Sequence, residues 1–183
     1  MSILFGPIRQ MGYVVQDIEA AMQHWTRALR VGPFYYAEDA PIHDFSYRGA
    51  ASDVRASIAL SYSGNMQIAL IQQRNEAPSS FLDFLNAGRT GLHHVGFLSS
   101  NFNRDLHRAR EAGLDVVQTS IIGGRDGKFA ILSSDDPVRT KAALIATSDW
   151  NVDLFRMVEK EARRWDGSGP MRRFENWESV KEC

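Results

Sequence analysis

The sequence contains almost no cysteine, no long apolar run and almost no net charge. Its single cysteine is the last residue, Cys183, which excludes a disulfide framework within the chain and a zinc cluster built from cysteines. No apolar run approaches the roughly 18 residues that a membrane span needs. The formal net charge of −1 provides no attraction toward nucleic acid or an anionic membrane. We therefore expect neither of these partners.

The composition is that of an ordinary globular protein. The chain has 183 residues, of which 44% are hydrophobic and 23% charged, enough for a buried core and a solvated surface. This length suits one domain or two small fused modules. No charged N-terminal region is followed by a long apolar segment, the pattern of a signal peptide, so we expect a cytoplasmic protein.

The order of predicted elements is the same in the two halves of the chain: a strand, a helix and three strands. In the first half, apolar spacing predicts strands over 8–15, from Phe34, over 54–62 and over 66–73, a helix after Asp17, and a loop over 41–53. In the second half it predicts strands over 92–98, 116–122, 129–133 and 141–147, and a helix capped by Asn101 or Asn103. The repeated order indicates an internal duplication.

Two further helices complete the prediction. A short amphipathic helix begins after Ala77-Pro78-Ser79-Ser80, and a longer one covers about 151–164. We therefore predict an α+β fold. Its parts are a first βαβββ module at 7–73, a helical linker at 74–90, a second βαβββ module at 91–148, and a C-terminal helix and tail at 149–183.

Two adjacent histidines lie within a predicted buried strand. Side chains alternate along a strand, so we expect His93 and His94 on opposite faces, with His93 in a structural role and His94 in the wall of a cavity. An unperturbed imidazole titrates near neutral pH and suits proton transfer, which makes His94 the candidate catalytic residue. Gln10 holds the matching place in the first half, because it precedes Gly12 by two residues as His94 precedes Gly96.

Several segments carry a resemblance to a known family: Arg9-Gln10-Met11-Gly12-Tyr13-Val14-Val15 with Asp17-Ile18-Glu19-Ala20-Ala21-Met22 after it, Val31-Gly32-Pro33-Phe34, Gln67-Ile68-Ala69-Leu70-Ile71-Gln72-Gln73, Gly91-Leu92-His93-His94-Val95-Gly96-Phe97 and Trp165-Asp166-Gly167-Ser168-Gly169-Pro170. Over about residues 7–172 the chain resembles the vicinal oxygen chelate superfamily, which includes glyoxalase I, methylmalonyl-CoA epimerase, extradiol dioxygenases and bleomycin-resistance proteins. The resemblance implies two modules that form a curved mixed sheet around a cavity, with an added C-terminal helix. We also expect a homodimer.

The same resemblance implies a metal site that is incomplete. In the superfamily, up to four His, Gln or Glu side chains from the first and last strands of the modules hold a divalent metal. The opening positions fall here on Gln10 and His94. The closing positions, usually glutamate, fall on Ala69 and on either Ala143 or Ala146, depending on the register of the last strand. Alanine has no ligand atom, so this site has lost its carboxylates.

A second glutamine is a candidate replacement ligand. Gln67 lies two residues before Ala69 and shares its strand face. The implied cofactor is therefore either none or a divalent metal ion held by Gln10, Gln67 and His94. Such an ion would stabilise an enolate or activate a bound oxygen.

The remaining candidates concern the substrate. Gln10, Gln67, Tyr35 and Tyr47 are the predicted substrate-binding residues, and the aromatic side chains suit a flat apolar ligand, with packing in the strand core as the equal alternative. The loss of carboxylates favours an uncharged, apolar substrate, including aromatic and polycyclic ones. We predict a glyoxalase-like lyase or isomerase that acts next to a carbonyl, with His94 as its acid/base group. The alternative is a protein without catalytic activity that binds or sequesters a hydrophobic small molecule.

Overall fold

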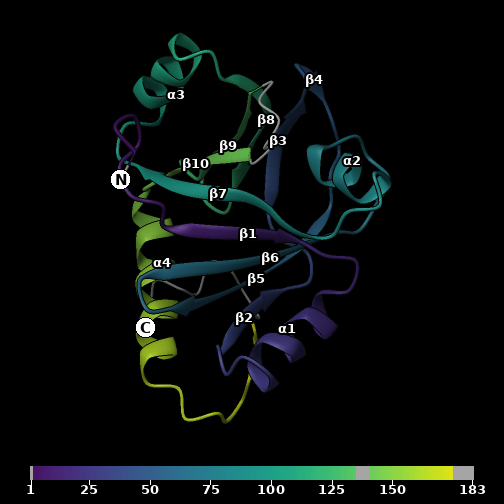
Figure 1. Ribbon diagram of the computed structural model, residues 1–183, viewed down its shortest axis with the longest axis vertical. Helices are drawn as coiled ribbons and strands as arrows, with labels where there is room; N and C mark the ends of the chain where they lie inside the picture. Colours follow the sequence, from purple (N-terminus) through teal and green to yellow (C-terminus); the bar gives the residue numbers. More distant parts are fainter. Residues whose placement is uncertain (1, 135–140, 175–183) are drawn as a thin grey trace.

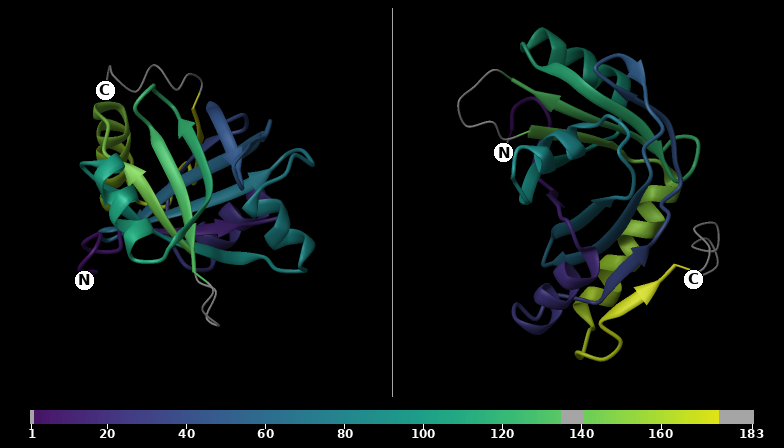
Figure 2. Two further views of the ribbon diagram at one scale, coloured as in Figure 1. Left: turned by 90° about the horizontal axis from the view of Figure 1, so that it is seen from above. Right: turned by 90° about the vertical axis from the view of Figure 1, so that its right-hand side faces the viewer.

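The protein is described by a computed structural model that covers residues 2–134 and 141–174. Within these residues 11 strands form one curved mixed sheet that does not close on itself (Figures 1 and 2). The strands are β1 (Gln10–Val14), β2 (Phe34–Ala37), β3 (Ile42–Tyr47), β4 (Ala50–Ala51), β5 (Ala56–Ser63), β6 (Met66–Gln73), β7 (Gly91–Ser99), β8 (Asp115–Ile122), β9 (Lys128–Ser133), β10 (Lys141–Ala146) and β11 (Met171–Arg173). The helices are α1 (Ile18–Arg27), α2 (Ser80–Asn86), α3 (Phe102–Glu111) and α4 (Asp149–Arg163). This architecture confirms the predicted α+β class.

The two halves of the chain meet at the centre of the sheet. The strand order is β11-β2-β5-β6-β1-β7-β10-β9-β8-β3-β4, and the central strands β1 and β7 are antiparallel. Strand β6 runs parallel to β1 on one side, and β10 runs parallel to β7 on the other. The opening strands of the two halves are therefore neighbours, which brings Gln10 and His94 together from positions far apart in the sequence.

The prediction of a loop over 41–53 is wrong, because two strands lie within this range. Residues Ile42–Tyr47 form β3, which pairs with β8 from the other half of the chain, and Ala50–Ala51 form the short strand β4. The pairing of β3 with β8 is irregular between His43 and Ser46. The alternation of buried and exposed side chains expected of a strand is therefore not visible in the sequence. Hydrogen bonds to β8 stabilise this strand. Because β8 is distant in the chain, the residues around β3 do not indicate this pairing.

The helices cover both faces of the sheet, because neighbouring residues of a strand point to opposite sides. Leu70 packs with Ile18 of α1, whereas the next residue, Ile71, packs with Phe81 of α2. Helix α3 packs on strands of the second half, and α4 places Leu154 against β5 and β6. In Figure 1, α2 and α4 lie on opposite sides of the molecule. The space between them is where a cavity remains.

Side-chain caps begin the helices. Asp17 accepts a hydrogen bond from the amide of Ala20, and Asn101 accepts one from the amide of Arg104, which satisfies amides that have no partner within the helix. Of the two caps predicted for the second of these helices, Asn101 is the one found. None of the described helices is long and apolar enough to cross a membrane.

Candidate functional site

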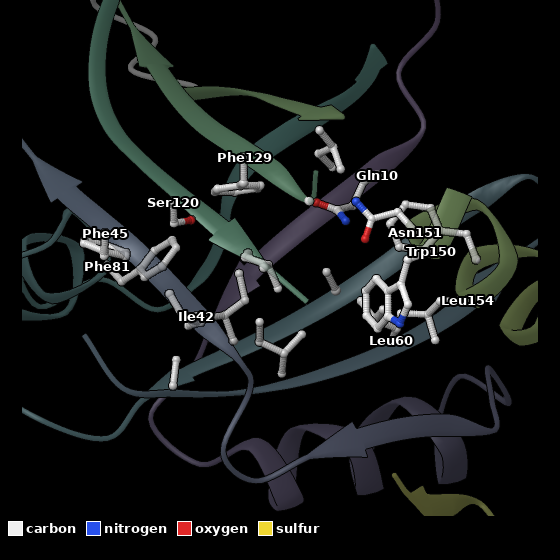
Figure 3. Close-up of a pocket in the computed structure, with 18 residues that line it drawn as sticks. Gln10, Ile42, Phe45, Leu60, Phe81, Ser120, Phe129, Trp150, Asn151 and Leu154 are labelled. Atoms are coloured by element: carbon white, nitrogen blue, oxygen red, sulfur yellow. The ribbon is translucent and has the colours of Figure 1, made fainter. Parts of the chain in front are cut away.

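An apolar cavity lies inside the curve of the sheet, with α2 and α4 at its two ends (Figure 3). It encloses about 70 Å³. Its lining residues are Gln10, Ile42, Phe45, Ala56, Ile58, Leu60, Ala69, Ile71, Phe81, Ser120, Ile122, Gly127, Phe129, Ile145, Trp150, Asn151, Leu154 and Phe155. Phe45 and Phe81 lie at one end in Figure 3, and Gln10 and Asn151 lie at the other. Among the described residues, none that line the cavity carries an acidic or basic side chain.

Gln10 is the point at which a row of polar side chains, all buried except the half-buried Tyr62, reaches the cavity. The row consists of Tyr62, Gln67, Gln10, His94 and His93. Gln10 Nε2 lies 2.5 Å from Gln67 Oε1, and Gln67 Nε2 lies 3.1 Å from the hydroxyl of Tyr62. On the other side, Nε2 of His94 lies 3.3 Å from Oε1 of Gln10. Of these five residues, Gln10 alone belongs to the cavity lining.

The two histidines do not point to opposite faces, so that prediction is wrong. Gly12 pairs with His94 but Tyr13 pairs with Leu92, which leaves His93 as an extra residue in β7. Such a bulge breaks the alternation of side chains. The Nδ1 atoms of the two rings lie 3.0 Å apart, with the ring planes nearly perpendicular. His93 and His94 therefore act as one hydrogen-bonded pair.

Two glycines make room for the row: Gly12 for the ring of His94, and Gly96 for the side chain of Gln10. A Cβ atom on Gly12 would lie 2.1 Å from the ring of His94, and one on Gly96 would lie 2.8 Å from Cβ of Gln10. Because β1 and β7 are antiparallel, each polar side chain lies over the glycine of the other strand. The spacing of Gln10 from Gly12 and of His94 from Gly96 thus has a packing reason.

Burial keeps the row uncharged near neutral pH. It lowers the pKa of the fully buried His94 to about 3, with a further contribution from the ammonium of Lys141. Burial also lowers the pKa of His93 well below 6.5, and the charges of His94 and Lys141 act in the same direction. Burial raises the pKa of the Tyr62 hydroxyl. His94 is therefore a neutral hydrogen-bonding group outside the cavity lining, and its predicted role as acid/base group lacks access to the cavity.

The structure brings Gln10, Gln67 and His94 together, but as a donor set they do not suit a divalent metal. All three are neutral, and the nearest nitrogen and oxygen atoms are already hydrogen-bonded to one another. Divalent metal sites with imidazole and amide ligands usually also include a negatively charged carboxylate ligand, and their ligand atoms are free to coordinate the ion. Within residues 2–134 and 141–174, no group of three or more His, Cys, Asp or Glu side chains is placed to hold a metal ion.

The register of the strands places the alanines on which the closing positions were expected to fall. Ala69 pairs with Gly12 and Ala143 pairs with Gly96, so Ala69 and Ala143 hold equivalent places in the two halves. Ala143 packs in the same buried cluster as residues that line the cavity. Ala146 lies three residues further along β10, and alternation turns it to the other face. Of the two registers left open by the sequence, this arrangement favours Ala143.

The two tyrosines predicted to contact substrate do not line this cavity, although Tyr47 lines a second pocket together with Lys141. The hydroxyl of Tyr35 accepts a hydrogen bond from Arg172 at 3.0 Å, so this side chain holds the C-terminal segment on β2. The hydroxyl of Tyr47 donates to the carboxylate of Asp83 in α2. Both hydroxyl groups therefore have structural partners that the sequence does not bring close.

The residues that do enclose the cavity come partly from elements with no predicted role in the site. Phe45 belongs to the strand that was predicted as a loop. Helix α4 contributes two pairs of residues one turn apart, Trp150 with Leu154 and Asn151 with Phe155. The members of each pair lie on the same face of the helix. The apolar stripe of α4 is visible in the sequence, but its spacing does not reveal that it closes the cavity.

A curved, unclosed mixed sheet around a cavity defines the class as the vicinal oxygen chelate fold. Residues 9–131 match the sequence model of the Glyoxalase/Bleomycin resistance protein/Dioxygenase superfamily. The chain belongs to this superfamily, because the match covers more than half of it.

Solved structures of the same fold include enzymes. Methylmalonyl-CoA epimerase from Mycobacterium tuberculosis has 14% sequence identity and a TM-score of 0.56, with 81% of this chain and 93% of that chain covered. A hypothetical protein from Bacillus halodurans has 16% identity and a TM-score of 0.55, with 78% and 94% covered. At these identities the similarity shows the fold alone. The comparison with curated proteins gave no match.

Proposed function

We propose that this protein binds an uncharged, apolar small molecule in the cavity between α2 and α4, and that binding rather than turnover is its function. The lining of the cavity is the observation that supports this proposal. Its polar side chains are the amides of Gln10 and Asn151, the hydroxyl of Ser120 and the indole of Trp150. A charged ligand group buried there would have no oppositely charged partner, which costs several kcal/mol. An uncharged ligand with one polar atom could form a hydrogen bond with the side-chain amide of Gln10 or Asn151.

The shape of the cavity favours a flat ligand and requires some movement. Its walls include the aromatic rings of Phe45, Phe81, Phe129 and Trp150, which suit an aromatic partner. The enclosed 70 Å³ is below the roughly 300–1,000 Å³ of pockets that hold drug-sized ligands. We therefore expect α4, which brings Trp150 to the wall, to shift outward when a bicyclic ligand enters.

The proposal is tested with a pair of probes of the same size. Acetylnaphthalene is an uncharged aromatic ketone, and naphthoate carries a carboxylate on the same ring system. Titration calorimetry should show at least about tenfold weaker binding of naphthoate, because its charge would be buried without a partner. Equal or tighter binding of naphthoate, or no binding of the ketone at its solubility limit, would contradict the proposal.

A matched pair of variants locates the binding site. Ala69 lines the cavity and is buried, whereas Ala50 is exposed in β4. Ala69→Leu should fill the cavity and weaken binding of acetylnaphthalene about tenfold or more, since overpacking costs about 1–3 kcal/mol. Ala50→Leu should leave the affinity unchanged. Thermal melts of both variants confirm that the fold is retained.

Catalysis next to a carbonyl, as a lyase or isomerase, is the second candidate. The amide of Gln10 reaches the cavity and is held by His94, so it could hydrogen-bond a carbonyl oxygen and stabilise an enolate. The carbon-bound proton would pass to a water molecule or hydroxide ion from solvent, because none of the described side chains that line the cavity is a base. The methyl protons of acetylnaphthalene report on this chemistry. If the protein catalyses their exchange in deuterium oxide and His94→Ala abolishes that exchange without loss of affinity, the protein is an enzyme. Exchange at the buffer rate supports binding alone.

Two further predictions concern the protein in its surroundings. We propose a homodimer, which sedimentation of the purified protein would test. We also propose a cytoplasmic location, on the basis of the sequence alone.

A further inference from the structure

Lys141 meets the row at His93, and neither residue lines the cavity. Its ammonium nitrogen lies 3.4 Å from Nε2 of His93, and the carbonyl oxygen of Ser80 lies 3.2 Å from the same atom. An ammonium group can only donate a hydrogen bond, and a carbonyl oxygen can only accept one. Nε2 of His93 therefore has two competing partners, and each requires the opposite protonation of that nitrogen.

The choice at His93 determines the direction of every hydrogen bond in the row. A neutral imidazole has one donor and one acceptor nitrogen, and the contact between the two Nδ1 atoms needs one of each. If Lys141 donates to Nε2 of His93, then Nδ1 of His93 donates to His94. Nε2 of His94 then donates to Oε1 of Gln10. The Nε2 of Gln10 donates in turn to Gln67, as the amides are oriented in the structure.

The other choice reverses the whole row. If Nε2 of His93 donates to Ser80, its Nδ1 must accept from Nδ1 of His94, and Nε2 of His94 must accept as well. The amide of Gln10 then has to turn over so that its nitrogen faces His94. Gln67 must turn with it, and its Oε1 then accepts from the hydroxyl of Tyr62. Each of the two directions satisfies the row, so the partner at His93 decides between them.

The contacts favour the direction set by Lys141. The contact from Lys141 involves a charged donor, whereas the slightly shorter contact between His93 and the carbonyl of Ser80 joins two neutral groups. A hydrogen bond from a charged donor is roughly twice as strong as one between neutral groups. A doubly protonated His94 is excluded by its complete burial without a carboxylate partner.

We propose that Lys141 is a specificity-determining residue for the ligand cavity, although it does not line it. It sets the direction of the row and thus decides which end of the Gln10 amide is donor and which is acceptor. At whichever point a ligand meets this amide, reversal of the row exchanges a donor for an acceptor. Its effect on ligands rests on the proposed binding function, whereas its effect on the histidines does not.

The imidazole nitrogens report the direction without any ligand. Heteronuclear NMR separates protonated from unprotonated ring nitrogens, and His93 and His94 can be assigned by substituting each in turn. In the wild-type protein we expect the proton on Nδ1 of His93 and on Nε2 of His94. In Lys141→Met, which keeps an unbranched side chain one atom shorter and removes the donor, we expect the proton on Nε2 of His93 and on Nδ1 of His94.

Two matched variants control this experiment. Lys141→Arg retains a charged donor and should keep the wild-type tautomers. Lys128→Met is the same substitution at a lysine whose ammonium lies beside Asn103, away from the row, and it should change nothing. Identical tautomers in wild type and Lys141→Met, or reversed tautomers in Lys141→Arg, would overturn the proposal.

Ligand selectivity is the second readout. Acetylnaphthalene offers only an acceptor, and naphthylethanol offers a donor as well. Lys141→Met should change the ratio of their dissociation constants by about fivefold or more, since a hydrogen bond contributes about 1 kcal/mol. If the tautomers reverse but neither compound binds, the proposed function fails and the role of Lys141 in the row stands. If the tautomers reverse and both ligands bind with an unchanged ratio, its role in specificity is refuted.

Discussion

Gly12→Ala is expected to be among the most damaging small substitutions in this protein. The added Cβ would lie 2.1 Å from two atoms of the His94 ring, whereas non-bonded carbon atoms prefer about 3.5–4.0 Å. The ring is fully buried and cannot move aside into solvent. It must therefore leave its place between His93 and Gln10 or push β1 away from β7.

The magnitude follows from two effects. Overpacking of a buried site costs about 1–3 kcal/mol, and a buried polar group that loses its partner costs about 1–3 kcal/mol. We therefore expect a loss of roughly 2–6 kcal/mol in the free energy of unfolding, measured by urea titration. Gly124→Ala is the matched control, because its Cβ would meet no atom closer than 3.7 Å.

A double-mutant cycle tests the reasoning itself. In His94→Ala the ring is gone, and the alanine at position 12 would enter the space that it vacated. Gly12→Ala should then cost less than about 1 kcal/mol, which gives a coupling energy of at least about 1–2 kcal/mol between the two positions. If Gly12→Ala costs as much in the His94→Ala background as in the wild type, contact with the ring is not the cause and the reasoning is refuted.

Three further predictions concern pH, the cavity and the tail. Because the pKa of His94 falls to about 3 in the folded state from the usual 6.5, the unfolded state takes up its proton first. The contribution of His94 to stability is therefore complete above pH 6.5 and decreases as the pH falls toward 3. The free energy of unfolding should fall by about 2 kcal/mol by about pH 5. Urea titrations of His94→Gln should show a flatter pH dependence of this free energy, and His24→Gln, at an exposed histidine, is the control. Trp150→Ala should cost about 2 kcal/mol or more yet tighten binding of ketones larger than acetylnaphthalene in calorimetric titrations, and weaker binding would contradict its place in the cavity wall. Arg172→Ala removes the ion pair with Glu161 and should lower stability by no more than about 1 kcal/mol in a thermal melt, because both groups are partly exposed.

Much of the fold follows from local patterns. The apolar spacing of α1 and α3, the caps Asp17 and Asn101, and the repeated order of elements all predict what the structure contains. The placement of a glycine two residues after Gln10 and after His94 correctly points to two equivalent places. These features depend on neighbours within a few residues, and the sequence contains them directly.

The strand β3 shows where such reasoning ends. Ile42–Tyr47 has mixed polarity and an irregular register, so its own residues favour a loop. It is a strand because the curvature of the sheet brings it beside β8, where its backbone groups find hydrogen-bond partners. This pairing also brings Phe45 to the cavity, and no local signal identifies that residue as part of the site.

The sequence by itself determined the superfamily, the α+β class and the set of polar residues at the centre, Gln10, Gln67 and His94, because a duplicated pattern of strands and glycines encodes them. Only the tertiary structure decided what that set can do. The bulge at His93 turns two histidines into one pair, burial keeps that pair neutral, and α4 closes the cavity with side chains distant in the sequence. Each of these depends on which surfaces pack together, and packing sets the charge state and the access of a side chain.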